Sequence, residues 1–328
     1  MNARIIGGIP DRAARPRPRA RATHGRRRNP GRLPGFERAA VPFATVTRSP
    51  ITRPLRPALL LALVFCTASA AAQPSPHLRT ATIVIDGQPT TVDVHEPGTT
   101  EVVGLAIVAH GWTRSREHHR DIGIALAEAG VVAVIPDLPN VVNLWGNGSA
   151  IVDLARQLEA GALGLPPILP PSLVLIGTSA GGLATVLAAT KLPGIAGWIG
   201  LDPVDRMGTG VYAASSLEVP AIVLFGDASA CNLAGSARTF ARSLPRLVRA
   251  KKFEGASHCD FEGPTDGFCQ RLCGRAKEET TLAIRAETVL ATLELLTAAH
   301  AGVGARDRDG GAPLPAAEAP PPPEPPPE

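Results

Sequence analysis

The chain has 328 residues and a formal net charge of +4, but its charges are unevenly placed. Residues 1–56 hold 14 Arg, no Lys and two acids and so carry +12, which leaves −8 for the remaining residues. This distribution argues against a nucleic-acid-binding surface on the part of the chain that folds, because the excess of basic residues does not lie there.

Residues 51–72 have the pattern of a secretory signal peptide. Arg53 and Arg56 precede an apolar run, 58–65, that is too short to span a bilayer, and small residues follow up to Ala72. We expect cleavage after Ala72 and a product that is secreted or periplasmic, with no stable membrane span after cleavage.

The two ends of the chain are expected to lie outside the folded domain. Residues 1–50 are interpreted as a basic disordered leader or as the result of a start codon assigned too early. Residues 303–328 are rich in Gly, Ala, Pro and acid, a composition that predicts a Pro-rich disordered tail. Residues 73–302 are then expected to form one domain of ordinary size.

Strand and helix patterns alternate along this domain. A β-hairpin is predicted first, over 80–85 and 91–95. Further strands are predicted at 102–109, 131–135, 173–176, 195–201, 221–225 and 247–253. Helices are predicted at 117–129, 150–158, 183–190 and 278–299. This order predicts an α/β fold with a doubly wound, mostly parallel sheet and helices on both faces.

The stretch Gly177–Gly181 is the most informative motif of the chain. It reads Gly-Thr-Ser-Ala-Gly between a predicted strand and a predicted helix. In that position Gly-x-Ser-x-Gly is typical of the nucleophile elbow of α/β-hydrolases. The turn is so tight that the residues two before and two after the serine have no room for a side chain, a condition that glycine meets. We therefore predict the α/β-hydrolase fold, with Ser179 as the nucleophile.

A serine nucleophile needs a base, and a third group that orients the base. α/β-Hydrolases carry these groups in the order Ser, acid, His, and only His258 and His300 follow the serine. His258 lies in a small-residue loop after the last predicted strand, so we predict it as the base. Asp202 and Asp227 each end a strand after the serine and either can be the acid; Asp205 is a third candidate.

Two backbone N–H groups are predicted to form the oxyanion hole. One belongs to Ala180, directly after the nucleophile, and the other to Trp112, in the loop that follows the strand 102–109. We expect the Trp112 indole to line the pocket and His110 to support the loop. The segment 140–148 is expected to be a long loop at the border of the pocket.

Four cysteines follow the expected cleavage site: Cys231, Cys259, Cys269 and Cys273. An even number in an exported chain predicts two disulfides, with three possible pairings. Zinc is the alternative, although the spacings are not those of a ribbon or a finger.

A second metal alternative is the pair His118 and His119, beside Glu117 and Asp121. We interpret these four as solvated residues at the start of a helix. We therefore predict neither a metal nor a cofactor.

Several of these motifs together resemble the chlorophyllase-like branch of the α/β-hydrolases, which is related to the bacterial cutinases and polyester hydrolases. The motifs are His110-Gly111-Trp112, the stretch 177–182, the Gly-Leu-Asp-Pro-Val-Asp stretch at 200–205, and Ser257-His258-Cys259-Asp260 with the late cysteines. By its match to the first aspartate of the Asp-Pro-Val-Asp segment, Asp202 is implied as the acid of the triad.

The sequence thus predicts an exported serine hydrolase that cleaves carboxylic esters through an acyl-enzyme. Its substrate is expected to be a small-molecule or polymeric ester, and the chain is expected to act as a monomer. Two alternatives stay open: an acyltransferase with the same triad, and a catalytically silent binding protein with a hydrolase fold.

Overall fold

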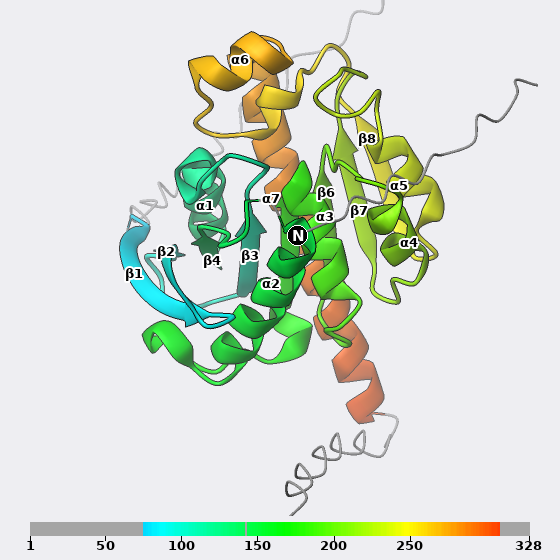
Figure 1. Ribbon diagram of the computed structural model, residues 1–328. Coiled ribbons are helices and arrows are strands. Elements are labelled where there is room, and N and C mark those ends of the chain that lie inside the picture. The colour runs from blue at the N-terminus through cyan, green and yellow to red at the C-terminus, as the bar shows by residue number, and fades with distance from the viewer. Residues whose placement is uncertain (1–74, 142, 309–328) are drawn as a thin grey trace, which may run out of the picture. The chain divides into compact units, whose positions relative to one another are not determined.

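Figure 1 shows the computed structural model of the chain, which describes residues 75–141 and 143–308. The expected leader, the signal peptide and residues 309–328 of the expected tail lie outside the described residues. None of the helices in the described ranges combines the length and the apolar character that crossing a membrane requires.

The described residues are built around an eight-stranded sheet in the order β1-β2-β4-β3-β5-β6-β7-β8. β2 pairs antiparallel with β1 and β4, and every other neighbouring pair is parallel, which confirms the predicted mostly parallel sheet. The strands are β1 His77–Ile85, β2 Gln88–Glu96, β3 Gly104–Ala109, β4 Val131–Pro136, β5 Leu173–Thr178, β6 Gly197–Leu201, β7 Ala221–Phe225 and β8 Leu247–Lys252.

Helices cover both faces of this sheet (Figure 1). The α-helices are α1 Arg120–Glu128, α2 Leu144–Glu159, α3 Ala180–Ala189, α4 Thr209–Ser215, α5 Ala237–Ser243, α6 Gly267–Cys273 and α7 Glu278–Arg308. Short 3-10 helices are η1 Arg116–His119, η2 Ala162–Gly164, η3 Pro170–Ser172 and η4 His258–Phe261.

Alternation along the buried strands divides the core into two layers. In β3, Leu105 and Ile107 pack with side chains of α2 and α3, whereas Ala106 and Val108 pack with those of α1 and α7. Successive side chains of a strand point to opposite faces, so a fully apolar strand supplies both layers at once. The continuous apolar runs of the sequence follow from this arrangement.

Helix α2 begins earlier than predicted, so the long loop expected at 140–148 is wrong. The Asn143 side chain accepts a hydrogen bond from the Gly146 N–H at 3.0 Å and caps the helix. The sequence does not indicate the first turns of α2, because they contain two glycines and glycine is a weak helix former. Gly148 nevertheless has a packing role, because a Cβ there would lie 3.0 Å from the Cβ of Leu187 in α3.

Helices also differ from the prediction elsewhere. α7 continues to Arg308, beyond the predicted end at 299 and into the segment that was expected to be tail, and no proline occurs before Pro313 to end it earlier. Helices α4, α5 and α6 have seven residues each and are too short for a helical pattern to stand out.

Candidate active site

Ser179 lies at the sharp turn between β5 and α3. Its φ of 55° and ψ of −123° are unusual for a residue with a side chain. The Ser179 N–H donates to the Leu201 carbonyl at 3.0 Å, and the Ser179 carbonyl accepts from the N–H groups of Gly182 at 2.9 Å and Val204 at 3.0 Å. The strained turn is therefore held by backbone hydrogen bonds on both sides.

The two glycines that flank the serine have no space for a side chain, as predicted. A Cβ on Gly177 would collide with the hydroxyl of Thr185 and the carbonyl of Gly181. A Cβ on Gly181 would collide with the carbonyls of Ala109 and His110. Glycine at 177 thus lets β5 pack against α3, and glycine at 181 lets α3 pack against the end of β3.

Asp202 and His258 are in direct contact. The Asp202 carboxylate is fully buried, and its Oδ2 lies 2.6 Å from Nδ1 of His258, whose side chain is 10% exposed. An ionised carboxylate only accepts hydrogen bonds, so Nδ1 is assigned the proton and Nε2 is left as the acceptor. Within the described residues, no hydrogen bond joins His258 to Ser179. Catalytic hydrogen bonds of this kind are often long before a substrate is bound.

Asp227, the alternative acid, has a different partner. Its side chain is 49% exposed and lies 2.7 Å from the ammonium group of Lys252. It also accepts a hydrogen bond from the Gly255 N–H at 3.0 Å. The hydrogen bond from Lys252 lowers the pKa of Asp227 below its ordinary value. Asp227 therefore holds the turn after β8 and does not contact His258.

The remaining candidates from the sequence also lie in structural contacts. Asp205 accepts hydrogen bonds from the backbone N–H groups of Gly210 at 2.7 Å and Val211 at 3.3 Å, which holds the start of α4. His300 lies near the end of α7 with its Nε2 3.0 Å from the hydroxyl of Ser172. Ser172 directly precedes β5, so His300 lies at the edge of the sheet opposite to Ser179.

The loop after β3 passes directly over Ser179. A Cβ on Gly111 would lie 3.1 Å from the Cβ of Ser179 and 3.6 Å from its hydroxyl oxygen. The Trp112 N–H donates no hydrogen bond to another described residue. The Ala180 N–H belongs to the first turn of α3, where a helix leaves such groups without an internal partner. Neither of these two N–H groups thus has a hydrogen-bond partner among the described residues.

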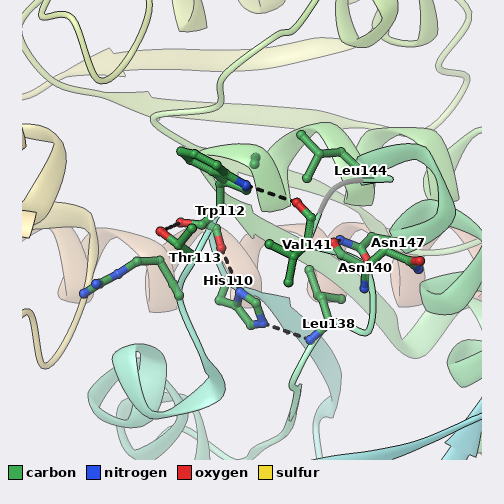
Figure 2. Close-up of a pocket in the computed structure, with 11 residues that line it drawn as sticks. His110, Trp112, Thr113, Leu138, Asn140, Val141, Leu144 and Asn147 are labelled. Atoms are coloured by element: carbon green, nitrogen blue, oxygen red, sulfur yellow. Dashed lines mark hydrogen bonds between the residues drawn. The ribbon is translucent and has the colours of Figure 1, made fainter.

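His110 holds this loop, as expected (Figure 2). Its Nε2 accepts the Leu138 N–H at 2.9 Å, so Nδ1 carries the proton and donates to the Gly111 carbonyl at 2.8 Å. Burial lowers the pKa of His110, which favours this neutral form. The imidazole thus links the loop after β3 to the segment after β4.

A pocket lies beside this loop (Figure 2). The Trp112 indole lines it, is 57% exposed as a residue, and donates to the Val141 carbonyl at 3.1 Å. Leu144 forms a small apolar cluster with Leu183 and with Ala180, the residue after Ser179. The lining residues are His110, Gly111, Trp112, Thr113, Arg114, Leu138, Asn140, Val141, Leu144, Asn147 and Ala180.

An ion cluster that sequence patterns did not reveal joins the loop after β3 to the segment after β8 that follows His258. Arg114 forms two hydrogen bonds of 2.7 Å with the carboxylate of Glu262 and one of 3.1 Å with Asp266. The side chains of Arg114 and Glu262 are only 8% and 6% exposed. Such a paired guanidinium fixes both distance and orientation, so Arg114 sets the spacing of the two segments.

Asp260 places the histidine turn and was likewise not predicted. Its Oδ2 accepts hydrogen bonds from the N–H and the hydroxyl of Ser257, at 2.7 and 2.8 Å. Its Oδ1 accepts from the Lys277 N–H at 2.7 Å, at the start of α7. Because η4 begins at His258, this carboxylate determines where the imidazole lies.

The four cysteines form two disulfides, Cys231–Cys273 and Cys259–Cys269. This confirms the predicted disulfides and selects one of the three pairings. No thiolate of these four is left to bind zinc. Both disulfides end in α6, and Cys259 directly follows His258, so the helix is covalently tied to the histidine turn.

The interpretation of residues 117–121 as solvated is wrong for His119. His119 is fully buried, and neither of its ring nitrogens has a hydrogen-bond partner among the described residues. Burial lowers its pKa from the ordinary value to about 4, so it is neutral at pH 7. The neighbouring His118 lies with Nε2 3.3 Å from Asp266. Helix η1 turns His119 inward, which its polar sequence does not indicate.

Two solved structures share this architecture. A dienelactone hydrolase from Anabaena variabilis superposes with a TM-score of 0.51 at 17% identity, over 66% of this chain and 96% of that chain. Est1E from Butyrivibrio proteoclasticus superposes with a TM-score of 0.50 at 18% identity, over 66% and 99%. The chain has the α/β-hydrolase fold. No protein-family model and no curated protein matches it in sequence.

Proposed function

We propose that the chain is an exported serine hydrolase that cleaves carboxylic esters. The observation that carries this proposal is the buried contact of 2.6 Å between Asp202 and His258, in a chain that presents Ser179 on a strained elbow. A buried acid, an oriented imidazole and an elbow serine are the three parts of a nucleophilic triad. Fold alone does not determine function, so the proposal is based on this site.

In the proposed reaction, the Ser179 hydroxyl attacks the carbonyl carbon of the ester. Nε2 of His258 takes the hydroxyl proton, and Asp202 holds the Nδ1–H and stabilises the imidazolium that forms. The N–H groups of Trp112 and Ala180 donate to the oxyanion of the tetrahedral intermediate. His258 then gives its proton to the leaving alcohol, and a water molecule activated by the same nitrogen releases the acid.

The pocket supports an ester with a compact apolar part. Trp112, Leu138, Val141 and Leu144 present apolar surface to this pocket. Asn140 adds an amide to the same lining. Pockets that combine apolar walls with a few polar groups orient small ligands in this way. We propose a small-molecule ester, or the exposed ester group of a polymer, as the substrate.

Export and membership of the chlorophyllase-like branch belong to the same proposal. The two disulfides favour an oxidising compartment, such as the periplasm or the exterior of the cell. The export signal is assigned to residues 51–72 on their sequence alone. The branch is proposed on the Asp-Pro-Val-Asp segment at 202–205, whose first aspartate contacts His258. We propose that the exported protein acts as a monomer.

The proposal is tested with Ser179→Ala on a series of p-nitrophenyl esters of increasing acyl length. We expect kcat to fall at least about 10⁴-fold, and labelling by a fluorophosphonate probe to disappear. Ser172→Ala, at the opposite edge of the sheet, is the control and should leave kcat and labelling unchanged.

Turnover retained by folded Ser179→Ala would overturn the proposal. A wild-type protein that the probe does not label would favour a binding protein, and transfer to an added alcohol as the main reaction would favour an acyltransferase.

A further inference from the structure

Asn232 is a fully buried amide in the loop after β7. Its Nδ2 donates to Oδ2 of Asp202 at 3.0 Å and to the carbonyl of Asp227 at 2.8 Å. Its Oδ1 accepts from the N–H groups of Ser229 at 2.8 Å and Gly235 at 2.9 Å. Both amide protons and both acceptor positions are thus used. The orientation of the amide is determined, because a flipped group would place NH₂ against two N–H donors.

The Asp202 carboxylate depends on this amide for its orientation. Oδ2 accepts from His258 and from Asn232, whereas among the described residues Oδ1 accepts only a longer hydrogen bond of 3.3 Å, from the Gly226 N–H. Burying a carboxylate costs free energy unless enough hydrogen-bond donors surround it. Without Asn232, one long hydrogen bond would be left to oppose rotation of the carboxylate away from the imidazole.

The loop that carries Asn232 is itself anchored. The preceding residue, Cys231, is bonded to Cys273 at the end of α6. Asp227, whose carbonyl accepts from Asn232, donates its own N–H to the carbonyl of Ala256 at 2.9 Å, two residues before His258. The amide therefore lies between the segments that carry the acid and the base.

We infer that Asn232 is a positioning residue that holds the Asp202 carboxylate in the orientation in which it accepts the His258 Nδ1–H. The inference rests on the proposed function, because Asn232 acts only through these two residues. The two ends of the amide have separate roles. Oδ1 holds the loop, and Nδ2 holds the carboxylate.

Substitution can separate these roles. Asn232→Asp retains an oxygen that accepts from Ser229 and Gly235, but it replaces the donor with a second carboxylate oxygen facing Asp202. Asn232→Ala removes both functions. Ser229→Ala is the matched control, because its hydroxyl lies buried in the same loop without a hydrogen-bond partner among the described residues.

We expect kcat for p-nitrophenyl esters to fall roughly 10- to 100-fold in both Asn232 variants, the range for a lost hydrogen bond to a charged group. KM should stay within about twofold and the control should match wild type. Two facing carboxylates share a proton at lower pH, and the protonated group then donates. The ratio of variant to wild-type kcat should therefore rise as pH falls for Asn232→Asp and stay level for Asn232→Ala. Thermal unfolding shows that each variant is folded.

The inference is overturned if folded Asn232→Asp keeps wild-type kcat, or if its ratio is as independent of pH as that of Asn232→Ala. Failure of the proposed function gives a different result, namely no Ser179-dependent turnover in the wild-type protein. In that case the proton NMR resonance of the His258 Nδ1–H, identified by its absence in His258→Ala, decides the inference without substrate. A resonance that shifts or broadens in Asn232→Asp but not in Ser229→Ala supports it, and an unchanged resonance overturns it.

Discussion

The two sides of the candidate site are built in different ways. The nucleophile side, formed by the loops after β3 and β5, consists of backbone packed against backbone where Gly177 and Gly181 leave no gap. The acid–base side, formed by the segments after β6, β7 and β8, consists of side chains that meet across long stretches of sequence, as Asp202 and His258 do. One side therefore depends on the space that glycine provides, and the other on the burial and pairing of polar groups.

The largest expected effect is on the acid–base side. Asp202→Asn retains the shape of the acid but removes the charge that holds the Nδ1–H of His258, so we expect kcat to fall by about 10⁴-fold. Asp227→Asn removes the charge that pairs with Lys252 in the exposed turn after β8, keeps an oxygen that can accept from the Gly255 N–H, and should stay within about twofold of wild type. Steady-state kinetics on one p-nitrophenyl ester measures both. If kcat collapses in Asp227→Asn and not in Asp202→Asn, Asp227 is the acid of the triad.

The next effect is on the nucleophile side and appears in stability. Gly181→Val would press a side chain into the carbonyls of Ala109 and His110, which cannot move without displacing β3. We expect a loss of about 3 kcal/mol or more in the free energy of unfolding, measured by urea denaturation. Gly267→Ala is the control, since a Cβ there meets no atom within 4 Å and should change stability little. Equal stability of the two variants would show that the elbow tolerates a side chain.

The smallest effect concerns His119, which is buried in η1, the helical turn that follows the loop after β3. Its pKa of about 4 in the folded chain lies below the ordinary value, so between those values the unfolded chain binds more protons. Stability from this group is therefore complete above about pH 6.5 and is lost as pH falls toward 4. We expect about 2 kcal/mol of this loss between pH 7 and pH 5.

His119→Phe should reduce the slope of the free energy of unfolding against pH, because it removes the titrating group while filling similar space. A substitution at the exposed His77 should leave the slope unchanged. Urea denaturation of the three proteins at pH 7 and pH 5 measures the difference. If the free energy of unfolding depends on pH equally in wild type and His119→Phe, the pKa of His119 is not lowered by folding.

Features that depend on neighbouring residues could be predicted from the sequence alone. The apolar runs that became β3 to β7 and the elbow around Ser179 are local, because strand alternation and a tight turn involve only a few consecutive positions. The order of these elements was then enough to predict the sheet and the edge at which the candidate residues lie. His258 could be selected for the same reason, since it lies in the short loop after the last strand.

The tertiary structure decided what depends on burial and on distant partners. Asp202 and Asp227 both end strands, and the motif resemblance favoured the first. Only the fold shows that Asp202 is buried against His258 while Asp227 faces Lys252 and solvent. The pairing of the disulfides and the contacts of Asn232 and Arg114 were equally hidden, because a polar residue in a loop looks the same in sequence whether it is solvated or buried. The free energy of a hydrogen bond or an ion pair depends on what surrounds it, and that is determined when the chain folds.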